Sequence, residues 1–571
     1  MRETSRPVLA TPDHPSTLPA LLSARLSDAP DHVAFRRDGV DITTAEFAEQ
    51  VAALARAWHA AGIRPGDAIA CMAPTRYEWA LVDFAAGRLG AVVVAVYDSS
   101  ADAQISQILA EVPVAAAVVD TREVAERWRS TFGIDRVWTM APSDDSLAAL
   151  IVHAPTDDAT LPEPPTPDAI ATIVHTSGTE GRSKGVLVTH RNLVDMALNV
   201  AAAYPDVVHD RATTLIFLPM AHILARALQV CAVGAGMRIS HLGDPTGVLG
   251  ALADARPTFL VVVPRVLEKV RDAARTKASA AHIGTLYRRA ERVAIDMGRL
   301  REDEDAGRPA RPALALRLAH RLFDALFYRR ARALLGGRLG FLLSGAAPLD
   351  ADLSLFFRGM GLPVVEGYGL TETTAPATGN RPGAIRSGTV GPPMPGTTIR
   401  IADDGEVCVR GIGVCAGYVG GEPHLDDEGF FLTGDLGELD DDGYLRITGR
   451  TKDIVVTSSG KNINPAPWEA VVQRDLGLQA VLLVGDARPY PTAILVAEGE
   501  TPFPGVTVDD PNALVAAERA VTRANTDVSR AEQVKRFVLV RADLAGVMTP
   551  TQKVRRADTL ESAADLIDGL Y

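Results

Sequence analysis

The stretch ATIVHTSGTEGRSKG, residues 171–185, joins a short apolar run to a loop rich in glycine and hydroxyl side chains. The run Ala171–Thr176 has the length and composition of a buried strand. After it, residues 177–185 contain three glycines, three hydroxyl side chains and Lys184. Glycines let backbone N–H groups approach phosphate oxygens, hydroxyls donate further hydrogen bonds, and a lysine adds a compact positive charge. The stretch therefore predicts an anion-binding loop at the end of a strand, and Ser183 before the lysine excludes the Walker A form of such a loop.

Further apolar runs of strand length recur between helical-looking stretches from about residue 33 to residue 500. This alternation predicts an α/β protein with largely buried strands. Several runs end in Gly, Ser or Thr, which places polar groups at the carboxyl ends of strands, where open α/β sheets bind ligands. The runs are Leu215–Pro219, Phe259–Val263, Phe341–Ser344 and Val364–Glu366.

The chain has 571 residues, and a single hydrophobic core rarely extends beyond about 250–300 residues, so at least two units are expected. We place a large N-terminal unit over residues 1–451 and a small one over residues 452–571, where a shorter α/β pattern begins. Residues 280–338 form an Arg- and Ala-rich helical insertion in the large unit, interrupted by the charged, Pro-containing stretch Arg301–Pro312. The small unit has strand-like runs at Ala480–Val484, Ala493–Ala497 and Phe537–Val540 and a helical stretch from about Pro511 to Val534.

Bulk composition excludes several classes of protein. The formal net charge of −13 gives no general attraction for polyphosphate, so no nucleic-acid partner is expected and anionic ligands need a local site. The four cysteines are scattered in a pattern that fits neither a zinc knuckle nor a redox pair. The N-terminus lacks the basic start and apolar stretch of a signal peptide, and the apolar runs are far shorter than the ~20 residues of a membrane span. A cytoplasmic protein is predicted.

A second group of polar residues follows two of the predicted strands. The sequence SGAAPL occupies residues 344–349, and EGYGLTE occupies residues 366–372. Small residues permit close approach of a flat ring, and Tyr368 offers an aromatic face to stack on it. Glu372 offers a hard oxygen ligand suited to Mg²⁺. These segments predict a site for a planar base beside a metal ion.

A third group lies nearer the C-terminus. Asp435 is in TGDLG, residues 433–437, and Arg450 is in GRTKD, residues 449–453. A carboxylate can accept both hydrogen bonds of a ribose diol, and an arginine complements that carboxylate or a phosphate. Lys553, in MTPTQKVRR at residues 548–556, supplies another ammonium group. Taken alone, the turn at Asp435 is more typical of an ordinary solvated group, and the Lys553 segment also fits the basic start of a helix.

The order and content of these segments resemble those of the adenylate-forming superfamily of acyl-CoA synthetases, adenylation domains and luciferases. The loop at residues 176–185 is similar to that family's YTSGTTGxPKG, and five motifs occur in the expected order over about residues 33–560. Glu180 and Ser183 depart from the pattern, which has threonine and proline there. A carboxylate beside a triphosphate repels it unless the carboxylate points away.

The resemblance implies a fold, a set of substrates and residue roles. The fold is the adenylate-forming enzyme fold, with a large multi-sheet N-terminal domain and a small, mobile α+β C-terminal domain that turns about Lys452. The substrates are ATP with Mg²⁺, a carboxylic acid and coenzyme A. The nucleotide-binding residues implied are Thr176, Ser177, Gly178, Thr179, Gly181 and Lys184 for the phosphates, Gly345, Ala346, Glu366, Gly367 and Tyr368 for adenine, Thr371 for the α-phosphate, and Asp435 and Arg450 for the sugar. Mg²⁺ is assigned to Thr176 and Glu372, and the catalytic residues implied are Lys553, Thr371, Glu372 and His222.

Like the helical insertion at residues 280–338, two segments resemble the long-chain branch of the family and narrow the acid to a long-chain fatty acid. They are LPMAHILAR, residues 218–226, and VPRVLEK, residues 263–269. His222 in the first segment is either a satisfied core histidine or a polar member of the acyl or ATP pocket. Residues Thr457–Pro465, which include Lys461 of the coenzyme A step, resemble the segment that long-chain synthetases bring to the active site for thioester formation.

Leucines recur every four residues beside arginines in the insertion, which predicts a basic amphipathic helix. The residues are Leu314, Leu318, Leu322 and Leu326, with Arg317, Arg321, Arg329 and Arg330. Packing of the leucines against the large unit is the favoured interpretation. A position on a membrane surface, where fatty acids partition, is the alternative. Peripheral contact with the inner face of a membrane and homodimer formation are therefore left open.

Three functions remain open from the sequence. The favoured one is a long-chain fatty acid-CoA ligase that forms AMP. A fatty acyl-AMP ligase would instead deliver the acyl group to a carrier-protein thiol, although no carrier domain is visible in the sequence. A catalytically impaired homologue would only bind acyl or nucleotide ligands, which Glu180 and Ser183 favour and the retained Lys553, Glu372 and Asp435 disfavour.

Overall fold

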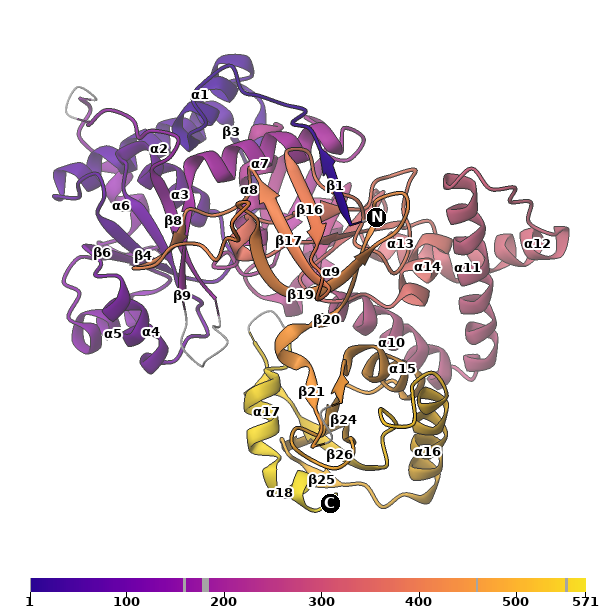
Figure 1. Ribbon diagram of the computed structural model, residues 1–571. Helices are drawn as coiled ribbons and strands as arrows, with labels where there is room; N and C mark the ends of the chain where they lie inside the picture. Colours follow the sequence, from indigo (N-terminus) through magenta and orange to yellow (C-terminus); the bar gives the residue numbers. More distant parts are fainter. Residues whose placement is uncertain (1, 158–160, 177–183, 459–460, 550–552) are drawn as a thin grey trace.

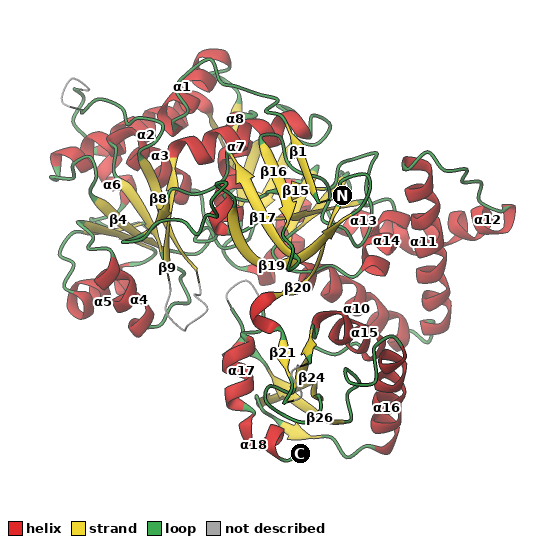
Figure 2. Ribbon diagram, viewed as in Figure 1, coloured by secondary structure: helices red, strands yellow, loops and turns green. Residues whose placement is uncertain are grey.

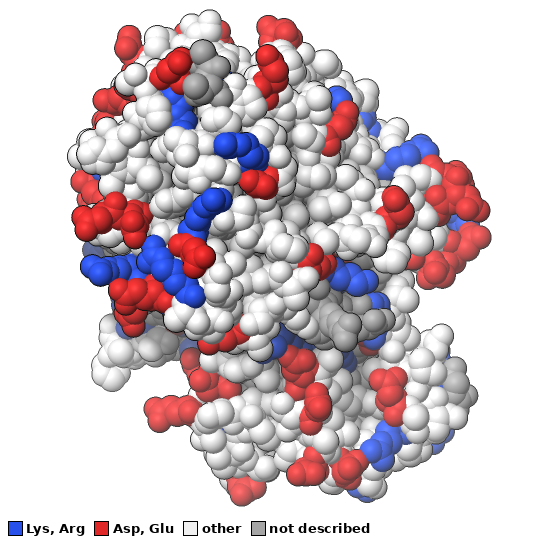
Figure 3. Space-filling view, turned by 90° about the vertical axis from the view of Figure 1, so that its left-hand side faces the viewer, with Lys and Arg blue, Asp and Glu red and all other residues white. Residues whose placement is uncertain are grey.

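The computed structural model describes all residues except 1, 158–160, 177–183, 459–460 and 550–552. A large body lies above a smaller one, which contains the C-terminus and follows strands β19 (Phe431–Leu439) and β20 (Leu445–Arg450) (Figure 1). Helices and strands are mixed in both bodies (Figure 2), which confirms the predicted α/β class. Acidic and basic side chains are interspersed over the face shown in Figure 3. No helix in the described part of the chain is long and apolar enough to cross a membrane.

A seven-stranded sheet flanks the predicted anion-binding loop. Its strands, in spatial order, are β18 (Gly417–Tyr418), β9 (Lys184–Thr189), β8 (Ile170–Thr176), β5 (Val92–Ala95), β4 (Ala68–Met72), β6 (Ala116–Val119) and β7 (Val137–Thr139). Strands β8, β5, β4, β6 and β7 run parallel. Strand β8 confirms the predicted strand before the loop, and β9, which begins at Lys184, pairs antiparallel with it on the far side of the loop.

An eight-stranded sheet carries the second group of polar residues. Its strands, in spatial order, are β15 (Thr378–Gly379), β14 (Val364–Tyr368), β13 (Phe341–Ser344), β12 (Phe259–Val262), β10 (Thr213–Ile216), β11 (Arg238–His241), β2 (Val33–Arg37) and β3 (Val40–Thr43). The four predicted runs are strands, although β10 ends at Ile216, ahead of Pro219, which has no N–H to donate to a ladder. Because β12, β13 and β14 are parallel, their carboxyl ends meet at one edge of the sheet.

A five-stranded antiparallel sheet carries Asp435 and Arg450 of the third group. Its strands are β1 (Glu3–Arg6), β16 (Thr397–Ile401), β17 (Glu406–Gly411), β19 and β20, in that spatial order. The register of the last two strands places Asp435 directly opposite Arg450. Residues 15 positions apart in the sequence are thus brought side by side by a hairpin.

Helices cover the sheets of the large body. A capping box between Thr43 and Glu46 starts α2 (Thr44–Ala60), and the buried side chains of Trp58 and Trp79 fill the core beside it. Nearly all of α3 (Glu78–Leu89) is buried, as expected of a helix enclosed by other elements. The other helices are α1 (Leu18–Asp28), α4 (Asp102–Glu111), α5 (Arg122–Phe132), α6 (Leu147–Val152), α7 (His190–Ala203), α8 (Ile223–Gly234), α9 (Val248–Ala255) and α14 (Ala351–Gly359).

The predicted insertion is helical, with two differences from expectation. It contains the end of α10 (Pro264–Ala280), then α11 (Gly284–Asp305), α12 (Leu314–Phe323), a π-helical turn (Asp324–Tyr328) and α13 (Arg329–Leu334). The break expected from Arg301 begins only after Asp305, because charged helix formers extend α11 as far as the turn at Gly307. The favoured packing of the leucines was wrong: Leu314, Leu318 and Leu322 are 71%, 56% and 55% exposed. The buried side chains of Phe323 and Tyr328 attach this segment to the large body instead.

The small body contains a four-stranded mixed sheet. Its strands, in spatial order, are β23 (Ala480–Val484), β24 (Thr492–Pro502), β26 (Arg536–Asp543) and β25 (Val506–Thr507), which confirm the three predicted runs. The other elements are the ribbon β21 (Val455–Val456) and β22 (Asn462–Ile463) and helices α15 (Ala466–Leu476), α16 (Pro511–Thr526), α17 (Arg556–Ser562) and α18 (Ala564–Asp568). Helix α16 ends at Thr526 rather than near Val534, because the Glu532 side chain accepts the Ser529 N–H and closes a turn.

Candidate functional site

A cavity of about 1610 Å³, lined by residues of both bodies, gathers most of the predicted site residues. Its walls come from the carboxyl ends of β8, β13 and β14, from the start of β9 and α8, and from the small body. Lys452, the predicted hinge residue, also lines it. The predicted site residues on its wall are Thr176, Lys184, His222, Gly345, Ala346, Gly367, Tyr368, Thr371, Glu372, Arg450 and Lys553.

Asp435 lies behind this wall and connects two of its residues. Its carboxylate is buried and accepts hydrogen bonds from the Tyr368 hydroxyl at 2.8 Å and from Arg450 Nε at 2.6 Å. The salt bridge to Arg450 compensates the buried negative charge. Burial raises the pKa of Tyr368, so its hydroxyl remains a donor. This network holds Tyr368 and Arg450 at the cavity wall.

Glu372 contacts a residue that the sequence did not single out. The Tyr418 hydroxyl donates a hydrogen bond to Glu372 Oε1 at 3.2 Å, and Lys184 Nζ lies 5.7 Å from the centroid of the Tyr418 ring. Tyr418 comes from β18, which reaches the cavity by pairing with β9. No local sequence pattern marks it, because only long-range sheet pairing brings it beside Lys184.

The oxygen donors of Glu372 and Thr176 fit Mg²⁺ bound together with a nucleotide. Among the residues that the structure describes, no cluster of three or more His, Cys, Asp or Glu side chains could hold a metal ion alone. Mg²⁺ is usually bound by one or two carboxylates together with substrate phosphates. Burial raises the pKa of Glu372, and an adjacent cation favours the ionised form of a carboxyl group. The Glu372 carboxylate, on a wall that Lys184 also lines, therefore suits a metal ion that arrives with its phosphates.

Glu111, at the end of α4, contacts both strands that flank the anion-binding loop. Its carboxylate lies 3.2 Å from His175 Nε2 on β8 and accepts the Gly185 N–H on β9 at 3.2 Å. A Cβ atom on Gly185 would lie 2.9 Å from the Ile173 side chain, so the close approach of the two strands requires glycine there. Four predicted phosphate-binding residues lie outside the described residues: Ser177, Gly178, Thr179 and Gly181. The two departures from the family pattern, Glu180 and Ser183, lie outside them as well.

Lys553 reaches the cavity from the small body. Desolvation, followed by repulsion from Arg450, lowers the pKa of Lys553 to about 8, and Asp435 opposes this shift. Lys553 still touches solvent inside the cavity, which moderates the desolvation. A substantial fraction of this lysine is therefore neutral above pH 8 before any nucleotide binds.

His222 is both a packed capping residue and part of the cavity wall. Its Nδ1 accepts the Leu224 N–H at 3.1 Å at the start of α8. Burial, and to a lesser degree the charge of Lys553, lowers the pKa of His222 to about 4. The ring is therefore neutral at physiological pH.

Besides Asp435, two of the predicted site residues that the structure describes do not line the cavity. The Glu366 side chain is buried, its Oε1 has no hydrogen-bond partner among the described residues, and burial raises its pKa to about 8. Lys461 forms an ion pair with Glu532 at 3.1 Å within the small body. In this arrangement Lys553 lies in the cavity and Lys461 lies outside it.

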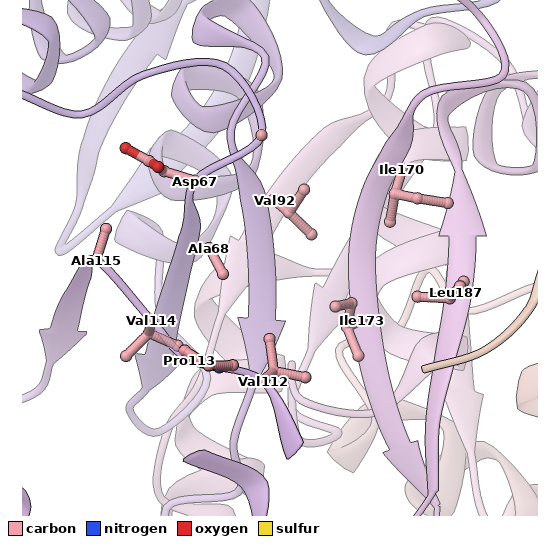
Figure 4. A pocket seen from close by; sticks show the side chains of 11 residues that line it. Asp67, Ala68, Val92, Val112, Pro113, Val114, Ala115, Ile170, Ile173 and Leu187 are labelled. Carbon is pink, nitrogen blue, oxygen red and sulfur yellow. The ribbon is translucent and has the colours of Figure 1, made fainter. Parts of the chain in front are cut away.

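A second cavity, of about 460 Å³, lies at the amino ends of the parallel strands of the seven-stranded sheet (Figure 4). Aliphatic side chains form most of its wall, among them Val92, Ile173 and Leu187, and Asp67 lies at its edge. None of the predicted site residues lines it. We assign the chemistry to the larger cavity.

The chain matches two family models that together cover most of its length. They are described as AMP-binding enzyme, at residues 22–419, and AMP-binding enzyme C-terminal domain, at residues 452–571. It is 37% identical over 604 aligned positions to the Long-chain-fatty-acid--CoA ligase FadD15 of Mycobacterium bovis, with 100% of each chain covered. Among solved structures it resembles the anthranilate CoA ligase AuaEII in complex with anthranoyl-AMP, with a TM-score of 0.74, 17% identity and 98% and 99% of the two chains covered. It also resembles a Mycobacterium tuberculosis fatty acyl CoA synthetase, with a TM-score of 0.66, 21% identity and 96% and 99% coverage.

The two structural likenesses, both below 25% identity, confirm the predicted fold. The family models and the full-length curated relative confirm the resemblance that the motifs carried. The chain belongs to the AMP-binding enzyme family, which is the adenylate-forming superfamily that its sequence resembles.

Proposed function

We propose that this protein is an ATP-dependent, AMP-forming ligase that activates a long-chain fatty acid and joins it to coenzyme A. The observation that carries the proposal is that Lys184, Glu372 and Lys553, from three distant segments, line one cavity. The relative FadD15, named a long-chain-fatty-acid--CoA ligase and matched over its full length, supports the choice of acid and acceptor. The substrates are ATP, a long-chain fatty acid and coenzyme A, and Mg²⁺ accompanies ATP.

In the first half-reaction the fatty acid carboxylate attacks the α-phosphorus of ATP. The bond from that phosphorus to the bridging oxygen of the β-phosphate breaks, pyrophosphate leaves and acyl-AMP remains. Lys553 and Thr371 stabilise the negative charge that develops on the α-phosphate oxygens. Lys184 orients the β- and γ-phosphates as a point charge. Glu372 and Thr176 would hold Mg²⁺, and the bound ion would neutralise phosphate charge.

The nucleoside lies between the second and third groups of residues. Adenine stacks on Tyr368 and lies against the small residues Gly345, Ala346 and Gly367, where bulk is excluded. A Cβ atom on Gly367 would lie 3.1 Å from the carbonyl oxygen of Thr378, which supports a requirement for glycine there. Asp435 and Arg450 bind the ribose, and their mutual hydrogen bond keeps both side chains ordered before the nucleotide arrives.

In the second half-reaction the coenzyme A thiol gives its proton to solvent and its sulfur attacks the acyl carbonyl carbon. The bond from that carbon to the phosphate oxygen of AMP breaks, so AMP leaves and the thioester forms. We place the boundary of the two domains at Lys452, with residues 1–451 on one side and 452–571 on the other. Rotation about this hinge withdraws Lys553 and brings the segment of Lys461 to the cavity. The present location of Lys553 in the cavity supports the assignment of this arrangement to adenylation.

Pyrophosphate release with palmitate, measured with and without coenzyme A, tests the proposal. The native protein should release pyrophosphate and form palmitoyl-CoA when the thiol is present, and Lys553→Ala should lose both activities. Lys535→Ala, at an exposed position of the small body, is the matched control and should keep both. Release without thioester formation would instead favour a fatty acyl-AMP ligase that serves a carrier protein. The absence of release in every condition would favour a binding protein impaired at Glu180 and Ser183.

We also propose that the enzyme contacts the inner face of a membrane peripherally. Long acyl chains partition into bilayers, and anionic lipids of the cytoplasmic leaflet attract basic segments of proteins. Homodimer formation is a separate proposal, which sedimentation velocity tests through the mass of the particle.

A further inference from the structure

We infer that one face of α12 and the turn after it is a docking surface for an anionic lipid bilayer. We call it the α12 face, and it consists of Leu314, Leu318, Leu322, Leu326, Arg317 and Arg321. The inference deepens the proposal of peripheral membrane contact. It does not depend on the ligase activity, because it concerns a surface and not the nucleotide cavity.

The apolar half of the α12 face is a continuous stripe of exposed leucines. Leu314, Leu318 and Leu322 are 71%, 56% and 55% exposed, and Leu326 in the following turn is 37% exposed. Residues four positions apart lie on one side of a helix, so these side chains adjoin one another. Contiguous exposed apolar groups of this kind mark interaction or membrane surfaces more often than scattered single ones do.

The opposite side of this segment is firmly attached to the large body. Phe323 and Tyr328 are buried in the core that contains α11 and α14, and the Tyr328 hydroxyl donates to the Ala290 carbonyl at 2.6 Å. The helix therefore has a packed face and an uncovered face. The helix is amphipathic, as the sequence predicted, but only the side of Phe323 and Tyr328 packs against the protein.

The charge of this region is mostly positive. Residues 306–338 contain eight arginines and a single acidic residue, Asp324, in a chain with a net charge of −13. Asp324 forms an ion pair with Arg332 at 2.7 Å, and the Arg332 side chain faces the large body, where it donates to the Met360 carbonyl. Arg317, Arg321, Arg329 and Arg330 form no ion pair with any residue that the structure describes. The exposed leucines are thus flanked by basic side chains without acidic neighbours of their own.

An anionic bilayer fits these features better than a protein partner of the same kind. Leucines enter the boundary between headgroups and acyl chains, while arginines extend along the surface to lipid phosphates. In a two-fold contact between copies of the chain, the arginines of one copy would approach the same arginines of the other, which is unfavourable. Helix α12 projects from the edge of the large body (Figures 1 and 2), so a flat surface can reach it. The acidic remainder of the protein is repelled by anionic lipid, which selects this face for contact.

Sedimentation with lipid vesicles tests the inference on the full-length protein. Vesicles of phosphatidylcholine with about one-third phosphatidylglycerol are compared with vesicles of phosphatidylcholine alone at low salt. The native protein should bind the anionic vesicles at least about tenfold more tightly. The double variant Leu318→Gln/Leu322→Gln should lose about tenfold or more of this affinity through lost apolar burial. The double variant Arg317→Gln/Arg321→Gln should lose a similar factor for anionic vesicles only.

A matched control separates this surface from general stickiness. Leu249 on α9 is 54% exposed, as much as Leu322, so Leu249→Gln should bind vesicles as the native protein does. Thermal transitions of all variants should coincide with that of the native protein, because every substitution is at an exposed position. Equal binding to both vesicle types, or unchanged binding of the leucine variant, would overturn the inference. Concentration-dependent self-association that Leu318→Gln/Leu322→Gln abolishes would assign the face to a second copy instead. Vesicle binding does not depend on pyrophosphate release. Failure of the ligase proposal would therefore leave the vesicle result unchanged, and failure of vesicle binding would leave the ligase proposal unchanged.

Discussion

Replacement of Lys553 by glutamine removes the ammonium group from the cavity while nearly preserving the length of the side chain. One preorganised donor at a developing oxyanion is worth about 10²–10³ in rate, so adenylation should slow by that factor. Thioester formation from added acyl-AMP and coenzyme A should change by less than about threefold, because the hinge motion withdraws Lys553 before that step. The variant should therefore separate the two half-reactions.

The pKa of Lys553 also predicts how the rate of adenylation depends on pH. Its pKa is lowered to about 8 by desolvation and by Arg450, so the side chain is charged below that pH and neutral above it. The charged fraction falls about tenfold between pH 7 and pH 9, and kcat/KM for ATP, which reports the free enzyme, should fall by about the same factor. Lys553→Arg keeps its charge throughout this range and should flatten the fall, although at a lower rate.

Isotope exchange between ATP and pyrophosphate measures adenylation, and palmitoyl-CoA formed from synthetic palmitoyl-AMP measures the second step. Lys535→Gln, which is exposed in the same body, is the control for a general loss of positive charge. Equal slowing of both half-reactions in Lys553→Gln would refute the assignment of Lys553 to the α-phosphate. The assignment would also be refuted if the isotope-exchange rate of Lys553→Gln kept the native dependence on pH.

Three further substitutions test other parts of the site. Asp435→Asn removes the negative charge that accepts hydrogen bonds from Tyr368 and Arg450. Because hydrogen bonds to a charged group are lost, KM for ATP, measured by isotope exchange, should rise by about tenfold. An unchanged KM would contradict the assignment of Asp435 to the ribose. Lys461→Gln should have the opposite effect to Lys553→Gln: isotope exchange should stay at the native rate and thioester formation should be slow. A loss of isotope exchange would contradict the assignment of Lys461 to the coenzyme A step. Glu366 has a pKa raised to about 8 by burial, so the folded protein is progressively destabilised as pH rises from the ordinary carboxyl range to about 8. Glu366→Gln avoids this and should gain about 3 kcal/mol over the native protein near neutral pH and almost nothing near pH 4, measured by thermal unfolding; an equal gain at both pH values would rule out ionisation as the cause.

Local sequence was sufficient for the strands and for most of the cavity wall. The run Phe341–Ser344 is strand β13 at the predicted residues, and β8 ends where the glycine-rich loop was expected to begin. Such apolar runs bury their side chains wherever they lie in a sheet, and polar residues at their carboxyl ends then meet at one edge. The assignment of Lys184, Glu372 and Lys553 to one site came from the resemblance of their motifs, in order, to the adenylate-forming superfamily.

Other features depend on which distant segments pair and which faces are covered. Tyr418 reaches Glu372 because β18 pairs with β9, and Glu111 contacts the stem of the loop from the end of α4. The Glu366 side chain is buried and does not line the cavity, although Tyr368, two positions further along β14, does. Strand alternation alone does not predict this difference, because it places residues two positions apart on the same face.

The leucines of α12 show the same division most clearly. Their spacing determined by itself that an amphipathic helix would form, because 3.6 residues per turn place every fourth residue on one side. Whether that side would be packed or exposed could not be read from the spacing, because the answer depends on which body lies beside the helix. Only the tertiary structure decided it, since Phe323 and Tyr328 occupy the available core and leave Leu314, Leu318 and Leu322 at the surface.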